Sequence, residues 1–425
     1  MMNDHRDAMG RPLVAITGAG IVTSLGRDKA ENWAALTAGR SGIKRIERFP
    51  TDGLRTNFAA TVDFLTGEAS PAPALTIELA RHATDEAIRE AAIGAQGRFP
   101  GPLFLATPPA ELEWPQRKAL YHAGRNSGLT GYQRLVDAAR EGDWDEMNSL
   151  FQFASVGEHL AQRFGTRGIP VSVSTACASG ATAIQLGVEA IRRGEADAAL
   201  CVGTDASVQI EALIRFSLLS ALSTRNDQPE HASRPFSKDR DGFVMGEGAA
   251  ALVLESYAAA KARGATVLGF VRGCGERADN YHRTRSKPDA SAIVGAIANA
   301  ITDACIPATK IDYVNAHGTS TPENDKMEYL ALKQVLGEHL TTTPISSSKS
   351  MIGHTLSAAG AIEAVISLLT IHNGMLPPTI NYDVADPEIP LDVVPNVARP
   401  ARVETVLSNS FGFGGQNAAL VIGAP

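Results

Sequence analysis

The sequence predicts an α/β protein with two similar halves, and the first observation behind this prediction is an alternation of two patterns. Apolar, β-branched runs such as Leu13–Thr17 and Val171–Ser174 alternate with alanine-rich amphipathic stretches at 181–193 and 290–304. Runs of the first kind are typical of buried strands, and stretches of the second kind are typical of helices that cover a sheet.

A weak internal repeat is the second observation. Segments 171–191 and 344–369 share one plan, in which a short strand leads to a Ser/Thr/Gly turn with reactive side chains and then to a helix that opens with small residues. Segments 13–26 and 266–279 both look like an opening strand that runs into a glycine turn. In duplicated α/β units, strand ends from both halves can face one another, so we expect reactive groups distant in sequence to converge.

The length of the chain, 425 residues, exceeds the size at which one hydrophobic core usually stops growing. We therefore place two halves at 1–265 and 266–425. From about 104 to 150, prolines, tryptophan and charged residues break the alternation. We interpret this segment, extended to about 165, as an insertion or cap that lines a site.

Composition and charge exclude several classes of protein. The balance of 39 Lys and Arg against 46 Asp and Glu gives a net charge of −7, which supplies no global positive field for a nucleic acid. Four scattered cysteines do not make a disulfide framework, which favours a reducing cytoplasm. The N-terminus is polar, and no apolar run of about 18 residues occurs, so we expect neither a signal peptide nor a membrane span.

Cys177 lies in VSTACASGATAIQLG, between a predicted strand and a helix of small residues. Because the N-terminus of a helix favours a thiolate, this position predicts a lowered thiol pKa and alkylation ahead of Cys201, Cys274 and Cys305. Its small neighbours leave room for a substrate. Taken alone, a buried structural thiol is an equally good interpretation, and it is the better one for the other three cysteines.

His317 and His354 lie on loops at predicted strand ends, in NAHGTSTPENDKME and SSSKSMIGHTLSAAG. A lone histidine is more often a satisfied polar group than a catalyst, so neither position alone establishes a site. Lys349 would hold a neighbouring histidine neutral and attract a carboxylated substrate. The turn NSFGFGGQN, at 409–417, has a backbone able to aim N–H groups at a ligand. No phosphate-binding or dinucleotide-binding glycine motif occurs.

Taken together and in order, STACASG, NAHGTSTPENDKME, SSSKSMIGH, AAGAIEAV and NSFGFGGQN resemble the signature of β-ketoacyl-acyl-carrier-protein synthases, and most closely the type II elongating synthases of fatty acid synthesis. The resemblance covers most of 11–60 and nearly all of 170–422. It implies a thiolase-like fold, in which two α/β halves form a five-layered α-β-α-β-α sandwich, and a homodimer. The implied reaction is decarboxylative condensation of a cysteine-bound acyl chain with a malonyl group. Both arrive on the phosphopantetheine of acyl carrier protein, with no bound organic cofactor.

The resemblance also implies a role for each residue that matches the family. Cys177 is the acyl-accepting nucleophile, and the N–H groups of Cys177 and Phe413 form its oxyanion hole. His317 and His354 bind the malonyl thioester and stabilise the enolate. The other implied residues support the histidines, gate the acyl tunnel or hold a cation: Lys349 and Glu363 for the His354 loop, Asp325 and Glu328 for the His317 loop, Phe216 with Phe413 for the gate, and Asn315, Glu363, Ser408 and Asn417 for a possible structural cation.

Departures from the family pattern concentrate between about 62 and 165, where LFLATPPAELEWPQRKALYHA replaces a glycine-rich loop. Ser220 stands where family members carry a basic residue that contacts the carrier. Because carrier proteins are acidic, docking on this net-negative chain needs a local basic patch. The candidates are Arg117, Lys118 and Arg125, and an ordinary solvated charged face is the alternative.

A type II polyketide ketosynthase is the nearest alternative, because it shares every catalytic residue. A thiolase would carry a second cysteine near its C-terminus, where this chain has none after Cys305. An inert chain-length partner would lack the nucleophile, so the presence of Cys177 argues against it. The sequence leaves the acyl length and the pathway open.

Overall fold

The structure, a computed structural model, describes residues 5–65, 70–94, 97–123 and 128–425. At its centre, ten strands follow the order β10-β9-β13-β14-β8-β1-β7-β6-β4-β5. Most of these strands are buried on both faces, as their apolar runs predict. Their bounds are β1 (Val14–Thr23), β4 (Leu103–Ala106), β5 (Val171–Val173), β6 (Ala198–Asp205), β7 (Gly248–Ser256), β8 (Gly269–Ala278), β9 (Tyr313–Asn315), β10 (Ile345–Ser346), β13 (Thr405–Phe411) and β14 (Gln416–Gly423).

The two ends of this strand series repeat one arrangement. Read from its outer edge, the N-terminal part is β5-β4-β6-β7-β1 and the C-terminal part is β10-β9-β13-β14-β8. When the five strands of each part are numbered by their order along the chain, both parts therefore read 3-2-4-5-1 from the outer edge inward. In both, the outer three strands are parallel and the inner three are antiparallel. This repeat supports the boundary placed at 265 and 266, which stays a prediction.

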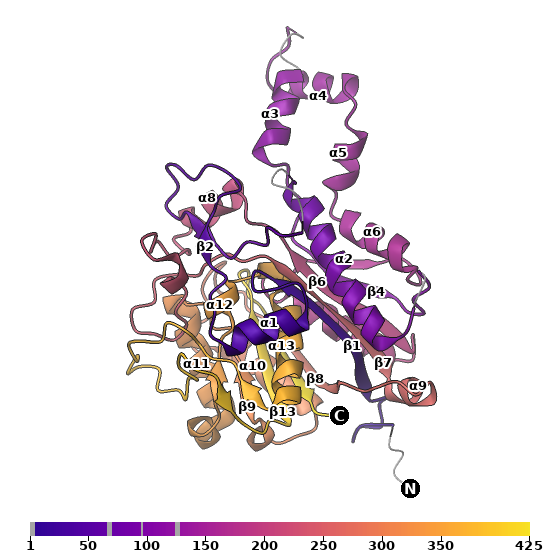
Figure 1. The fold of residues 1–425 in the computed structure, drawn as a ribbon, viewed down its shortest axis with the longest axis vertical. Coiled ribbons are helices and arrows are strands. Elements are labelled where there is room, and N and C mark those ends of the chain that lie inside the picture. Colours follow the sequence, from indigo (N-terminus) through magenta and orange to yellow (C-terminus); the bar gives the residue numbers. More distant parts are fainter. Residues whose placement is uncertain (1–4, 66–69, 95–96, 124–127) are drawn as a thin grey trace.

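Helices cover both faces of each part, which gives the five layers of a thiolase fold (Figure 1). The central helices share one apolar cluster with strands of both parts, and each outer pair forms a cluster with one part. From the N-terminal outer layer through the centre to the C-terminal outer layer, the helices are α2 (Ala72–Ala91) and α6 (Ser155–Phe164), α7 (Ser179–Arg192) and α13 (Ala359–Asn373), and α10 (Ser291–Asp303) and α11 (Pro322–Leu336).

The central helices α7 and α13 begin in the repeated segments and meet at their first turns. A Cβ atom on Gly180 would lie 2.5 Å from the backbone nitrogen of Ala361, and one on Gly360 would lie 2.5 Å from that of Ala181. The small residues that open both helices therefore serve close backbone packing as well as access to Cys177. The stretch Leu356–Asn373 is apolar and long enough to cross a membrane, but 72% of it is buried, as its place in the central layer requires.

A helical arm projects from the body of the molecule above α2 and α6 (Figure 1). It consists of α3 (Trp114–Ala123), α4 (Gly131–Glu141) and α5 (Asp145–Leu150). Among the described residues of these helices, only Ala138 is buried, while Trp114 is 61% exposed and Tyr132 is 75% exposed. The smaller elements are α1 (Lys29–Thr37), α8 (Ile210–Leu218), α9 (Tyr257–Ala262), α12 (Lys349–Ile352), and the pairs β2 (Lys44–Arg45) with β3 (Phe58–Ala59) and β11 (Met375–Leu376) with β12 (Arg399–Pro400).

Candidate active site

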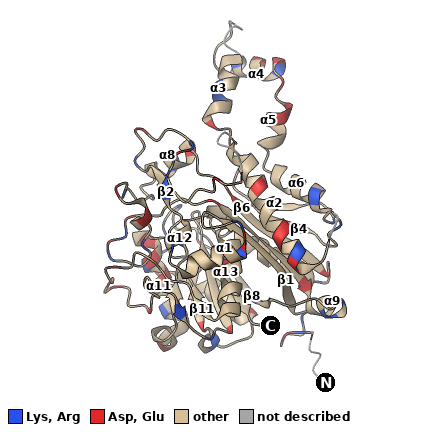
Figure 2. Ribbon diagram, in the orientation of Figure 1, with Lys and Arg blue, Asp and Glu red and all other residues tan. Residues whose placement is uncertain are grey.

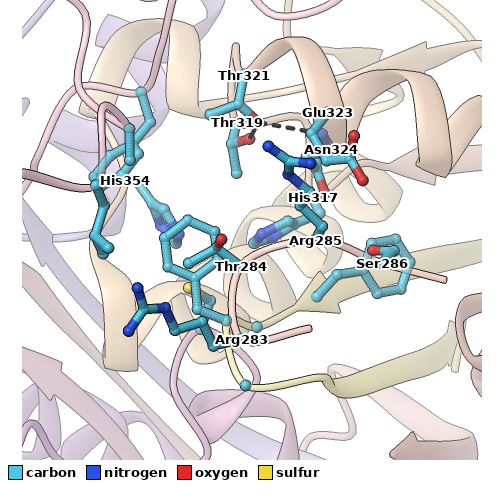
Figure 3. Close-up of a pocket in the computed structure, with 18 of the residues that line it drawn as sticks. Arg283, Thr284, Arg285, Ser286, His317, Thr319, Thr321, Glu323, Asn324 and His354 are labelled. Atoms are coloured by element: carbon cyan, nitrogen blue, oxygen red, sulfur yellow. Dashed lines mark hydrogen bonds between the residues drawn. The ribbon is translucent and has the colours of Figure 1, made fainter. Parts of the chain in front are cut away.

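A cavity of about 610 Å³ is lined by residues from both halves of the chain. Cys177, His317 and His354 lie in it, after β5, β9 and β10 respectively. The Cys177 sulfur and one ring nitrogen of each histidine all lie within 4.8 Å of one another. Figure 3 shows the two imidazoles facing the same space near the sulfur atom. The fold thus brings together three reactive groups that are far apart in the sequence.

Cys177 lies just before α7, as the sequence predicts. The prediction that this position lowers the pKa of its thiol is wrong. Burial raises the pKa of Cys177 to about 11, although the backbone N–H of Phe413, the Lys349 charge and the N–H of Cys177 itself act in the opposite direction. Desolvation of the sulfur therefore outweighs the helix terminus. Cys201 and Cys274 are buried, with raised pKa values, and Cys305 is exposed.

The loop of His317 is held by Glu328 of α11. This carboxylate accepts the backbone N–H groups of His317 at 2.9 Å and Gly318 at 2.8 Å, and the side-chain amide of Asn409 at 3.0 Å. Burial and then the charge of Lys349 lower the pKa of His317 well below its usual value, so the ring is neutral at pH 7. Its Nδ1 is buried and has no hydrogen-bond partner in the part of the chain that the structure describes.

His354 is oriented by the turn that follows it. The backbone N–H of Leu356 donates to Nδ1 of His354 at 3.2 Å, so the neutral ring carries its proton on Nε2. Burial and then the charge of Lys349 lower the pKa of His354 as well. Leu356 has a left-handed φ of 44°, and the next N–H, that of Ser357, donates to the buried carboxylate of Asp205 at 3.0 Å. Asp205 therefore holds a strained turn that positions His354.

Lys349 and Glu363 form an ion pair in the interior, with side chains 2% and 1% exposed. Burial raises the pKa of Glu363 to about 7, and the Lys349 charge opposes this rise. The same charge favours the thiolate of Cys177 and the neutral forms of both histidines. The two residues expected to support the histidine loop are thus in direct contact.

The two phenylalanines of the expected gate both line the cavity. Phe413 stands in a turn where Gly414 has a φ of 87°, a conformation that glycine adopts without strain. Phe216, on α8, meets Phe243 edge to face with ring centroids 5.3 Å apart, and Phe243 meets His354 at 5.4 Å. A chain of ring contacts therefore links Phe216 to a catalytic candidate.

Asp325 contacts the turn that follows His317, in the loop that the resemblance assigns to it. It accepts the backbone N–H of Phe236 at 2.7 Å and that of Ser320, and it lies 3.7 Å from the guanidinium group of Arg240. Ser320 has a left-handed φ of 69°. Asp325 thus braces the strained turn of the His317 loop.

The residues of the possible cation site fall into two places. Ser408 pairs with Asn315 across β13 and β9, and the Asn315 amide donates to the backbone oxygen of Glu363 at 2.9 Å. Among the described residues, Oδ1 of Asn315 and Oε2 of Glu363 are buried oxygens without a hydrogen-bond partner, which suits a cation. Asn417 pairs with Phe411, three residues along β13 from Ser408, so it does not belong to this cluster.

Several residues at the site were missed by sequence reasoning. Asp205 ends β6, and its position at a strand end was the available signal. Thr319 and Thr321 line the cavity and share a hydrogen bond of 2.8 Å (Figure 3). Arg283 and Arg285 also line it, and their signal was the cluster of four Lys and Arg residues in the segment RADNYHRTRSKPD.

The arm carries two of the proposed carrier contacts, Arg117 and Lys118, on α3, where both are exposed. Arg125 lies outside the described residues. Figure 2 shows acidic as well as basic segments on the arm, so its charge is mixed. No described residue of the 104–165 segment lines the large cavity, so a cap over this site finds no support within a single chain. Ser220 does line the cavity.

The comparison with known families agrees with the geometry. The N-terminal domain of β-ketoacyl synthases matches residues 12–89 and 115–260, and the C-terminal domain matches residues 268–383. The chain therefore belongs to the β-ketoacyl synthase family, a class of condensing acyltransferases with a thiolase fold.

Individual relatives match almost the whole chain. The 3-oxoacyl-[acyl-carrier-protein] synthase 2 of Coxiella burnetii is 38% identical over 97% of this chain and 99% of its own length. The tetracenomycin polyketide synthase ketoacyl synthase alpha subunit of Streptomyces glaucescens is also 38% identical, over 97% of each protein. Among solved structures, a β-ketoacyl synthase from Burkholderia phymatum has a TM-score of 0.82 at 34% identity and covers 97% of this chain and 99% of its own. A type II polyketide ketosynthase complex with its acyl carrier protein, AntDE:AntF, gives 0.85 at 32% identity over 98% of this chain and 100% of that one.

Proposed function

We propose that this chain is a β-ketoacyl-acyl-carrier-protein synthase that condenses a cysteine-bound acyl chain with a malonyl thioester in fatty acid elongation. The observation that carries the proposal is that the buried Cys177 sulfur and a ring nitrogen of each of two buried, neutral histidines lie within 4.8 Å of one another in one cavity. The substrates bring their own phosphopantetheine, so the protein needs no bound organic cofactor.

In the first half-reaction, the sulfur of Cys177 attacks the acyl thioester carbonyl. The new S–C bond forms as the bond to the carrier thiol breaks, and the Cys177 proton ends on the departing carrier sulfur. The N–H groups of Phe413 and Cys177, which already interact with this sulfur, are suited to stabilise the tetrahedral oxyanion. Because burial raises the pKa of Cys177 to about 11, the resting thiol is protonated at pH 7, and its proton leaves in the course of this half-reaction.

In the second half-reaction, the malonyl thioester loses carbon dioxide. The electron pair of the broken C–C bond moves onto the thioester oxygen, and Nε2–H of His354 with an N–H of His317 stabilises that charge. The enolate carbon then attacks the acyl-Cys177 carbonyl. The C–S bond breaks, and the released thiolate takes up a proton from solvent.

The test separates these two half-reactions. In Cys177→Gln, the acyl acceptor is gone while a neutral amide resembles an acylated site, so condensation should vanish and malonyl decarboxylation should persist or rise. Cys305→Gln, at an exposed cysteine outside the cavity, is the matched control and should retain both activities. A Cys177→Gln enzyme that still forms β-ketoacyl product would refute the assignment.

A type II polyketide ketosynthase is the second candidate, favoured by the polyketide relative and the carrier-bound ketosynthase structure. The two functions differ in the fate of the product of one condensation. A fatty acid synthase should stop at one β-ketoacyl product when no reductase is present, whereas a polyketide ketosynthase should add further malonyl units. Mass spectrometry of carrier-bound products, over a ladder of acyl lengths, distinguishes them.

The carrier, the oligomer and the cation complete the proposal. An acyl carrier protein is the substrate donor, which the AntDE:AntF structure of a ketosynthase with its acyl carrier protein supports. The Burkholderia β-ketoacyl synthase structure supports the same type of enzyme. A homodimer is expected, because in the described chain no strand pairs with the outer side of β5, whose first residue, Val171, is 41% exposed. The cytoplasm is the proposed location. Light scattering checks the dimer.

Asn315, Glu363 and Ser408 would hold a structural cation between the strands and α13, and dialysis against a chelator should then lower the melting temperature.

A further inference from the structure

The loop between β8 and α10 presents several polar side chains to the cavity, and its shape is set by Asp279. The carboxylate of Asp279 accepts the backbone N–H groups of Tyr281 and Lys287, both at 2.8 Å. The backbone N–H of Asp279 donates to Gly415 at 2.7 Å, and the N–H of Gly414 donates to the carbonyl of Arg283 at 2.7 Å. The loop is thereby closed on itself and tied to the turn that carries Phe413.

Two arginines of this loop lie at the rim of the cavity. Arg283 and Arg285 line it and are nevertheless exposed, whereas Cys177 and both histidines are buried. Figure 3 shows both guanidinium groups beside the space that the histidines face. Within the described residues, neither arginine has a carboxylate within 4 Å, while the neighbouring Lys287 pairs with Asp289 at 3.0 Å. Two cations without acidic partners at the mouth of a substrate cavity are suited to bind an anion.

The other charges at the rim do not cancel this site. Asp241 lies 3.7 Å from Arg225, and Lys326 pairs with Glu388 at 3.4 Å. Glu323 also lines the cavity and has no basic partner within 4 Å among the described residues, so it weakens the positive field without neutralising it. Asp279 also lines the cavity, but its carboxylate is turned to the backbone N–H groups of Tyr281 and Lys287, so it is engaged within the loop. Arg283 and Arg285 are thus cations of the rim that have no carboxylate partner among the described residues.

The position of the arginines selects the anion. The carboxylate of a malonyl group lies close to its thioester, which must reach the buried sulfur of Cys177. An exposed guanidinium at the rim instead meets the opposite end of a pantetheine arm, which ends in a phosphate. We propose that Arg283 and Arg285 form the binding site for the phosphate of the phosphopantetheine arm, an inference that rests on the proposed function. Planar guanidinium groups suit a phosphate, since each can donate two parallel hydrogen bonds.

The direct test compares two probes that differ only in the phosphate, namely 4′-phosphopantetheine and pantetheine, by calorimetric titration of the full chain. In Arg283→Gln/Arg285→Gln, affinity for 4′-phosphopantetheine should fall about tenfold or more at low salt, and affinity for pantetheine should not change. Lys287→Gln, in the same loop but outside the cavity lining, is the matched control and should leave both affinities unchanged. Glu323→Gln should raise affinity for the phosphorylated probe alone.

Equal losses for both probes, or no loss for the phosphorylated one, would overturn the phosphate site. Kinetics with malonyl-carrier protein and malonyl-coenzyme A then identify the source of the phosphate. If KM rises for one donor only and kcat is unchanged, that donor is the source of the phosphate. If KM rises for both donors, the site binds the phosphopantetheine arm that they share. Failure of the proposed function is a separate result, because a wild-type enzyme without condensation can still distinguish the two binding probes.

Discussion

Replacing Lys349 by methionine removes one partner of the buried Lys349–Glu363 ion pair. The apolar side chain has a similar length, so packing is largely conserved, while the carboxylate of Glu363 loses its cation in a place where it is 1% exposed. Breaking a buried ion pair in this way typically costs about 3–5 kcal/mol of unfolding free energy. We expect a loss of that size at pH 9.

The loss should shrink as the pH falls. Glu363 has a folded pKa of about 7, above its usual value, even with Lys349 beside it, and removing the cation raises this pKa further. As the pH falls, Glu363 of the folded variant is therefore protonated at a pH where Glu363 of the unfolded chain, with its usual pKa of 4.5, is still ionised. This protonation removes the unpaired buried charge. Relative to wild type, Lys349→Met should be most destabilised above the folded pKa and recover stability between pH 9 and 6.

Urea denaturation at the two pH values measures this, with Lys349→Met/Glu363→Gln as the decisive partner variant. The double change leaves neither charge of this pair and should regain most of the lost stability. Lys326→Met breaks an exposed pair, 54% and 72% exposed, and should cost less than about 1 kcal/mol at either pH. A single variant as stable as wild type at pH 9, or a double variant no better than the single, would refute the reasoning.

Three further predictions concern reactivity and packing. At pH 7, iodoacetamide should modify the exposed Cys305 before Cys177, and the Cys177 rate should rise about tenfold per pH unit toward its pKa of about 11, so peptide mapping that found Cys177 first at pH 7 would contradict the effect of burial. His317→Ala and His354→Ala should each lower malonyl decarboxylation by about 10²–10³ while Cys177 still accepts some acyl group, and undiminished carbon dioxide release would remove these residues from the mechanism. Gly180→Ala should lower stability by about 1–3 kcal/mol, because the new methyl group would meet backbone 2.5 Å away, and a melting temperature equal to that of wild type would exclude this close approach.

Local sequence patterns predicted the fold class and the elements that carry the site. The strand Val171–Ser174 and the helices near 181–193 and 290–304 occur within a few residues of their predicted bounds. The repeat between 171–191 and 344–369 anticipated that two central helices begin beside reactive turns. Such features are predictable because periodicity and turn residues act over short distances along the chain.

The sequence by itself determined which reactive groups this protein carries, because Cys177, His317 and His354 stand in turns after strands. Only the tertiary structure decided their protonation, since a pKa depends on burial and on charges from distant segments. The helix terminus beside Cys177 predicted a thiolate, yet enclosure by both halves raises the thiol pKa to about 11. Asp205 could not be assigned for the same reason. It touches the His354 turn across the molecule, and such a contact depends on how the two halves pack.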